Sequence, residues 1–363
     1  GCGDDPSSPR RAITSKAAYI RRRCVAVFGA LRPRRRTAGA SAVINDGPDH
    51  IHLRCGSDIA PTLREAGFEG RFVEFSDPLL EGPLTPCADD AAWAAMGGPD
   101  PLGAMVPGPG AIAAQYAALD DLPHDAAITL WFEHDLYDQS ILVYLLARFA
   151  AAPPKRLRLI CVDRVDGVPD FRGLGQLSPD ALRALWAAER RTVDDQTYAL
   201  GQAAWGALQS PTPHALAALA AGATPALPPL AAALRRHLEE LPWVGDDLAR
   251  SERELLEATA ASPGLDGHKL FDAVLEAEDA PFFTDLILRN ALERLAPLIT
   301  SEPAGDPWPK QRHALTPDGE AVLKREAGFF AFTPAPRWVG GIAVDAAGPV
   351  WRWDGAAAAP VFG

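Results

Sequence analysis

The sequence predicts an α/β protein with a Rossmann-like, mainly parallel sheet at the N-terminus, followed by a helical region and a winged-helix C-terminal domain. Three observations predict this. From His50 to residue 177, short apolar strand-like segments alternate with helix-like segments, which is typical of parallel strands joined by crossover helices. Residues 178–248 show helical spacing throughout. From Ala249, three helical segments precede two short extended pieces, which is the order of a winged helix.

The first 49 of the 363 residues differ from the rest. They hold ten Lys and Arg against four acidic side chains, whereas the remaining residues hold 25 basic against 43 acidic ones. They are rich in Arg, Pro, Ser and Gly and show no sustained period. We expect a disordered or misassigned basic leader over 1–49, with an RNA-binding or targeting tail as the alternative.

The α/β region is expected over residues 50–177. Its expected strands are 51–55, 72–75, 127–132 and 157–162, and its expected helices are 59–66, 111–119 and 136–149. Gly67 ends the first helix, and Pro61 is tolerated only in a first helical turn, which predicts a cap near Asp58. His50 and His52 share one strand face at its amino end, and we interpret both as structural.

The remaining elements follow from caps and spacing. Ser178 and Pro179 open the helical region as an N-cap followed by proline at the first helical position. Helices are expected at 180–189, 194–208, 213–221 and 228–241 and, in the C-terminal domain over 249–363, at 251–261, 268–277 and 283–295. Extended pieces at 298–300 and 313–316 complete the winged helix. Pro317 then starts a terminal helix, and 338–353 is expected to form a last pair of strands.

Composition excludes several classes of protein. Hydrophobic residues make up 48% and charged residues 23%, which is ordinary for a globular protein. No run approaches the 18 or more apolar residues that a membrane span needs, so we expect no membrane partner. Five cysteines without CxxC spacing indicate neither a disulfide framework nor a zinc finger. A reducing cytoplasm is the expected location.

The segment LWFEHDLYDQ, residues 130–139, carries the strongest candidate site. Asp135 suits an N-cap and Asp138 the first helical turn, where the helix dipole favours an anion. Capping alone would account for both acids. Glu133 and His134 fall at the carboxyl edge of the strand, and we expect them to do catalytic acid/base work. Asp135 and Asp138 are the candidate metal ligands, and His134 would share a helix face with Asp138 if the helix began early enough.

Two other loops should converge on the same edge of a parallel sheet. Gly56, Ser57 and Asp58 follow the first strand, where free backbone N–H groups would bind an anionic ligand. Asp77 follows the second strand. The alternative for Gly56, Ser57 and Asp58 is an ordinary strand-to-helix turn, and the alternative for Asp77 is a simple turn residue. Cys55 would act as a nucleophile only with a base beside it, and a buried thiol is expected instead.

Two glutamines complete the candidate ligand-binding set. Gln139 lies in the helix after the candidate strand, and Gln176 lies in the loop FRGLGQLSP, where Gly173 and Gly175 permit tight backbone approach. A bare connector is the alternative for this loop. Hard oxygen ligands would favour Mg²⁺ or Mn²⁺ over Zn²⁺ as the cofactor.

The expected winged helix offers candidate nucleic-acid contacts. Arg289 and Arg294 lie on its third helix and Arg312 lies on the wing. Residues 249–345, however, hold ten basic and sixteen acidic side chains, which is the wrong sign for tracking phosphates. A protein contact or a structural role is therefore the preferred interpretation, and nucleic acid the less favoured partner.

Several segments resemble one family. In order they are HLRCGSDI, EFSDPLLEGP, LWFEHDLYDQ, FRGLGQLSP, ALPPLAAALRRHLEELP, RSERELLEA, RWVGGIAVD and VWRWD. From about Ile51 to Asp354 the chain resembles the bacterial family labelled domain of unknown function 1835, whose members often carry a second uncharacterised C-terminal region. The resemblance implies kinship with soluble bacterial proteins of unestablished activity and carries over no catalytic residue. The segment LPWVGDDLAR departs from the pattern, in which a basic or Asn-Gly turn precedes the helix.

Three classes of function follow. The leading hypothesis is a protein that binds a small anionic or nucleotide-like ligand at the rim of the α/β domain, with metal-assisted hydrolysis or group transfer as its chemistry. The alternative is a non-enzymatic, ligand-sensing regulator that contacts DNA or a protein through its winged helix. A purely structural interaction protein is the third class.

Overall fold

The computed structural model describes residues 44–80, 83–84, 109–278, 282 and 284–363. All of them belong to one compact unit, Ala42–Gly363. The predicted basic leader lies outside the described residues up to residue 43, as do residues 85–108 after the second strand. Within the described ranges, no helix combines the length and the apolar character that crossing a membrane requires.

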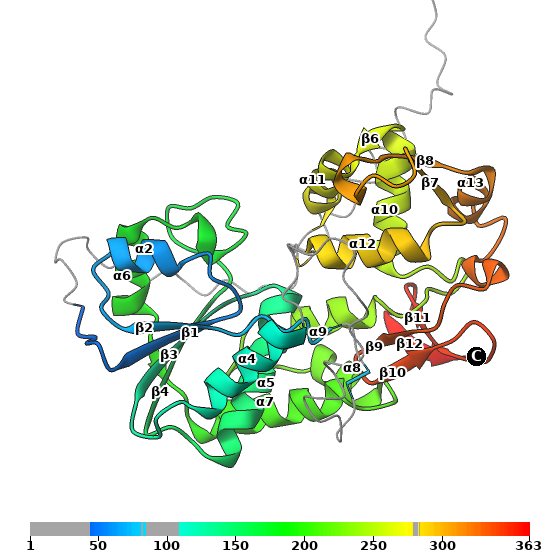
Figure 1. Ribbon diagram of the computed structural model, residues 1–363. Helices are drawn as coiled ribbons and strands as arrows, with labels where there is room; N and C mark the ends of the chain where they lie inside the picture. The colour runs from blue at the N-terminus through cyan, green and yellow to red at the C-terminus, as the bar shows by residue number, and fades with distance from the viewer. Residues whose placement is uncertain (1–43, 81–82, 85–108, 279–281, 283) are drawn as a thin grey trace, which may run out of the picture. The chain divides into compact units, whose positions relative to one another are not determined.

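A five-stranded sheet organises the first part of the unit (Figure 1). In spatial order its strands are β2 (Arg71–Glu74), β1 (His50–Arg54), β3 (Ala127–Glu133), β4 (Arg156–Val162) and β5 (Arg191–Thr192). The first four run parallel, and the two-residue β5 pairs antiparallel with β4. The prediction of a mainly parallel sheet is therefore confirmed, and each of its four predicted strands agrees with the structure to within one residue at either end.

Helices cover both faces of this sheet. Figure 1 shows α2 (Ala60–Glu65) and α6 (Pro179–Ala188) on one face and α4 (Pro109–Asp120) and α5 (Leu136–Ala151) on the other. Every residue of β1 is buried as a result, although its sequence alternates in the manner of a strand with one exposed face. The polar side chains of β1 must therefore find partners inside the protein.

The four helices predicted for the middle region are present. After α6 come α7 (Asp195–Leu208), α8 (His214–Ala221) and α9 (Leu230–Leu238). Their apolar residues share one core with β1, β3 and α5. The approach of α7 to α5 is close, because a Cβ atom on Gly201 would lie 2.4 Å from the Cβ of Leu146. The helical region thus packs directly on the helical layer of the sheet.

The next part packs around a second apolar core, which also includes Leu136 of α5 and Ala233 of α9. Its elements are α10 (Arg250–Ala261), β6 (Leu265–Asp266), α11 (Gly267–Ala277), α12 (Asp285–Arg294), β7 (Ile299–Glu302), η2 (Trp308–Lys310), β8 (Arg312–Leu315), α13 (Pro317–Leu323) and η3 (Phe329–Phe332). The three strands form an antiparallel sheet in the order β6-β8-β7. Leu255, Leu288 and Leu295 are fully buried in the core beneath it.

The last segment corrects one prediction. Residues 338–353 do not form a single pair of strands, because β9 (Arg337–Val339) pairs with β10 (Ile342–Val344) and β11 (Trp351–Asp354) pairs with β12 (Ala359–Phe362). The first hairpin turns at Gly340, whose φ of +58° suits glycine. Ala347 and Gly348, which lie inside the predicted range, belong to the connection between the two hairpins.

Candidate functional site

The strand order defines where a ligand site is expected. From β1 the chain moves to β2 on one side, whereas β3 and β4 follow on the other side, so the direction of winding reverses between β1 and β3. Ligands of open α/β sheets bind beyond the carboxyl ends of the strands at such a reversal. Arg54 and Glu133 are the last residues of these two strands.

Arg54 is the centre of the site. It is only 3% exposed. Its Nε and Nη2 donate to the two carboxylate oxygens of Asp58 at 2.6 and 2.9 Å, while Nη2 also reaches Glu133 Oε2 at 3.2 Å. Nη1 lies 3.4 Å from Asp138 Oδ1. Burial alone lowers the pKa of Arg54, but the negative groups around it, led by Asp138, outweigh burial and raise it.

Sequence reasoning missed Arg54. The available signal was a charged residue inside an otherwise apolar strand, which must find a counter-charge if both faces of the sheet are covered.

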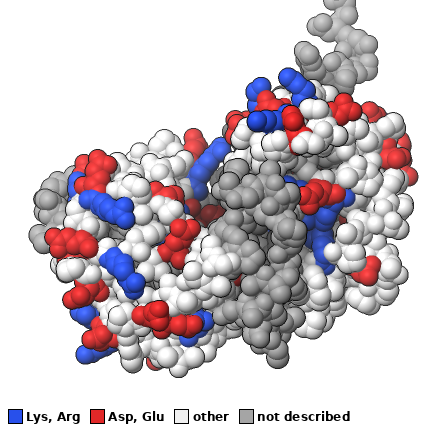
Figure 2. All heavy atoms as spheres, viewed as in Figure 1, with Lys and Arg blue, Asp and Glu red and all other residues white. Residues whose placement is uncertain are grey.

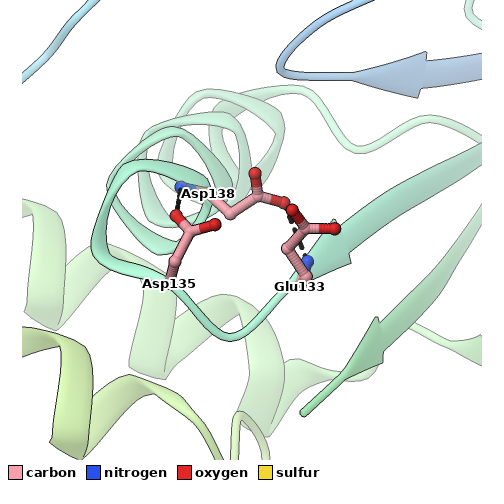
Figure 3. Close-up of side chains that lie close together, drawn as sticks. All are labelled: Glu133, Asp135 and Asp138. Atoms are coloured by element: carbon pink, nitrogen blue, oxygen red, sulfur yellow. Dashed lines mark hydrogen bonds between the residues drawn. The ribbon is translucent and has the colours of Figure 1, made fainter. Parts of the chain in front are cut away.

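Three buried carboxylates lie beside this arginine, from Glu133, Asp135 and Asp138 (Figure 3). One oxygen of each lies within 4.8 Å of the others. Asp138 Oδ1 accepts from the Glu133 backbone N–H at 2.8 Å, and Asp135 Oδ1 accepts from the Asp138 N–H at 2.8 Å. Asp135 is the N-cap of α5, so its predicted capping role is confirmed. The predicted metal role of Asp135 and Asp138 is compatible with this geometry.

Burial makes these carboxylates costly to ionise. Burial, assisted by the charge of Asp138, raises the pKa of Glu133 to about 7. Burial also raises the pKa of Asp135 well above its usual range, with Asp138 and Glu133 adding to the effect. The pKa of Asp138 is raised by burial as well, although Arg54 opposes it. With Asp58, four carboxyl groups face one guanidinium, so the site favours bound protons or a bound cation.

The loop before α6 closes over the carboxylates. It contains η1 (Leu174–Gln176), and the Leu174 N–H donates to Glu133 Oε2. A Cβ atom on Gly173 would lie 2.6 Å from Glu133 Oε1, which agrees with the predicted tight approach of this loop. Gln176 Oε1 accepts from the Arg172 backbone N–H at 2.8 Å. The predicted ligand reader Gln176 therefore uses its amide oxygen to hold the loop.

His134 and Gln139 flank the carboxylates. Because α5 begins at Leu136, His134 lies outside the helix and does not share a helix face with Asp138. His134 is half-buried, its ring lies 6.0 Å from that of Phe171, and burial lowers its pKa. Gln139 Nε2 donates to the Glu133 carbonyl. Within the described part of the chain, His134 Nδ1 and Gln139 Oε1 are buried without a hydrogen-bond partner.

The remaining predicted rim residues divide into two groups. Asp58 joins the Arg54 cluster, and Gly56 and Ser57 lie beside it in the same turn. Asp58 does not cap α2, whose N-cap is Ile59, because the Asp58 carboxylate is held by Arg54. Asp77 is fully buried and accepts a hydrogen bond at 2.6 Å from the Tyr116 hydroxyl.

Cys55 is not poised as a nucleophile. Its Sγ donates to Asp138 Oδ2 at 2.7 Å. Burial raises the pKa of this thiol well above its usual range, and the negative charge of Asp138 adds to the effect. The thiol form is favoured, as expected for a buried cysteine.

The three predicted nucleic-acid residues do not form a common cationic face. Arg294 Nε pairs with the buried Glu252 at 2.9 Å, and Arg289 lies 3.7 Å from Glu293. Arg312 is exposed and donates to the Gly264 carbonyl at 3.0 Å. Figure 2 shows acidic and basic side chains interspersed over the face in view.

No protein-family model matches the chain, and no curated protein matches it either. The function is therefore inferred from the geometry of the acid-rich cluster at the reversal point of the sheet.

Proposed function

We propose that the chain binds a divalent cation, Mg²⁺ or Mn²⁺, through Glu133, Asp135 and Asp138. The observation that carries the proposal is the imbalance of charge around Arg54, since three buried carboxyl groups and the exposed Asp58 face a single arginine. A divalent ion would offset the excess negative charge, and oxygen-only ligands suit a hard cation. The buried, unpartnered Oε1 of Gln139 offers a further oxygen beside Glu133.

The ligand proposed for this site is a small anionic or nucleotide-like molecule. Arg54 is already engaged by three carboxylates, so an anion would reach the site through the cation. The proposed chemistry is hydrolysis or group transfer, in which the cation polarises a ligand oxygen. With the cation bound to Glu133, proton transfer would fall to His134, whose pKa burial lowers. Glu133, the other residue expected to do acid/base work, would take part only where the cation leaves its carboxylate free, because burial raises its pKa to about 7 in the cation-free site.

Thermal unfolding with and without MnCl₂ tests this proposal. Asp135→Asn keeps an oxygen that can cap α5 but removes one carboxylate. Asp194→Asn is the matched control, because Asp194 caps α7 in the same way, accepting from Thr197 N–H at 2.8 Å, and lies outside the cluster. Mn²⁺ should raise the melting temperature of the wild type and of Asp194→Asn, but not of Asp135→Asn. Equal stabilisation of all three proteins would contradict the proposal.

We propose a second candidate function for the C-terminal part. The chain order α10-β6-α11-α12-β7-β8, with an antiparallel sheet in the order β6-β8-β7, supports a winged helix. Because Arg294 pairs inward with Glu252, a protein is the preferred partner and DNA the less favoured one. Fluorescence anisotropy with a labelled DNA duplex checks this preference, and we expect no binding of the duplex at physiological salt. Tight binding of the duplex that is lost in Arg312→Gln would favour the DNA-binding regulator instead.

Two broader proposals accompany these functions. Kinship with the domain of unknown function 1835 family is proposed on the sequence segments alone. A reducing cytoplasm is the proposed location, and the free thiols of Cys55 and Cys161 support it.

A further inference from the structure

A second polar site lies at the amino ends of the strands, the edge opposite the carboxylate cluster. A cavity of about 310 Å³ there is lined in part by Arg156, Arg158, Arg190, Asn45, Asp49 and His50. His50 aligns with Ala127 and Arg156 across β1, β3 and β4, and His52 aligns with Thr129 and Arg158. These side chains therefore share one face of the sheet.

The arginines reach the cavity because the helical cover ends there. Apolar residues of α6, such as Trp186, cover the same face further along the strands, and α6 ends at Ala188. Arg190 follows at once, with its guanidinium carbon 3.5 Å from the centroid of the Trp186 ring. Arg156 and Arg158, two residues apart on β4, are both exposed.

None of the three arginines forms an ion pair with a described residue. Arg156 donates to the Asp125 carbonyl at 3.3 Å, Arg158 to the Thr192 hydroxyl, and Arg190 to the Asn45 amide oxygen at 3.3 Å. All of these acceptors are neutral. The nearby Asp46 is taken by His52, at 3.0 Å.

The positive groups also repel one another. Burial lowers the pKa of Arg190, and the charge of Arg158 lowers it further, although Asp46 opposes this in part. Burial likewise lowers the pKa of His50 to about 4, with Arg190 and Arg156 contributing in the same direction. Three arginines converge here on the two carboxylates of Asp46 and Asp49, of which Asp46 is also bound to His52. The excess positive charge raises the free energy of the ligand-free protein, and a bound anion would relieve this.

We infer that this cavity binds a small molecule that carries a phosphate or diphosphate group. Guanidinium groups match phosphate oxygens in bidentate geometry, and three of them suit more than one negative charge. The small cavity argues for a small molecule. A long phosphate backbone is disfavoured, because the chain after residue 49 holds 25 basic against 43 acidic side chains.

Calorimetric titration with pyrophosphate tests the inference. Arg158→Gln and Arg190→Gln each remove one cation from the cavity, and Arg64→Gln removes one exposed cation that does not line it. Each cavity variant should raise the Kd for pyrophosphate by about tenfold, as expected for loss of a charge-assisted hydrogen bond. Arg64→Gln should keep the Kd within about twofold of the wild-type value.

Three results of this titration would overturn the inference. They are no binding at millimolar pyrophosphate, equal weakening by Arg64→Gln, and cavity variants that bind like the wild type. Asp135→Asn separates this site from the carboxylate cluster and should keep full affinity for pyrophosphate in EDTA. Loss of affinity in that variant would place the anion at the other edge of the sheet and would also overturn the inference.

Discussion

Replacing Glu133 by glutamine should remove a pH-dependent penalty on folding. Glu133 is 6% exposed, and burial together with the charge of Asp138 raises its pKa to about 7 from an ordinary value of 4.5. The folded protein therefore holds the proton of this carboxyl more tightly than the unfolded chain does. The resulting stabilisation is fully present below about pH 4.5 and is lost as the pH rises through about 7.

The size of this effect follows from the shift in pKa. At about 1.4 kcal/mol per unit of pKa, the raised pKa of Glu133 corresponds to about 3 kcal/mol of unfolding free energy in total. Roughly 2.5 kcal/mol of this is lost between pH 5 and pH 8. The glutamine side chain in Glu133→Gln would keep an oxygen for the Leu174 N–H but cannot ionise. Any hydrogen bond that the substitution weakens at both pH values cancels when the two free energies are subtracted.

Urea unfolding at pH 5 and pH 8, in EDTA, measures the difference. Between these pH values the wild type should lose about 2.5 kcal/mol more of its unfolding free energy than Glu133→Gln loses. Glu189→Gln, at an exposed glutamate after α6, should behave like the wild type. An identical pH dependence in the wild type and Glu133→Gln would refute the argument from burial.

Two further predictions concern packing and buried charge. In urea unfolding, Gly201→Ala should destabilise the protein by about 1–3 kcal/mol, because the new Cβ would lie 2.4 Å from that of Leu146. Gly206→Ala, in the same helix, places its Cβ where nothing lies within 4 Å and should be neutral or stabilising. Arg236→Met should cost about 3–5 kcal/mol because it removes a 2.7 Å ion pair to the fully buried Glu278. Lys324→Met, at an exposed pair that solvent screens, should leave the free energy of unfolding close to that of the wild type. Similar losses within either pair of variants would contradict the explanation.

Local signals predicted much of the fold. Asp135 capped α5 as expected because an N-cap depends on residues three apart in sequence. The loop glycine Gly173 lies close to a neighbour as expected, because glycine has no Cβ that would obstruct the approach. The sequence did not predict strand β5, because a segment of two residues is too short to show the alternation of a strand and is defined only by its pairing with β4.

Long-range partners limited the prediction of the site. Arg54 and Glu133 are 79 residues apart, and only the pairing of β1 with β3 brings them together. Asp77 also follows a strand of the same sheet, yet its carboxylate accepts a hydrogen bond from Tyr116 of α4. The position at a strand end could be predicted from the sequence, whereas the partner of each charge depends on tertiary packing.

Proton release during Mn²⁺ binding tests the central claim most directly. If the ion binds Glu133, Asp135 and Asp138, it must displace the proton that burial leaves on Glu133 near pH 7. Calorimetric titrations in buffers of different ionisation enthalpy should show release of about half a proton or more per Mn²⁺ at pH 7, and less at pH 9. Mn²⁺ binding without proton release at pH 7, or no binding at all, would contradict the account.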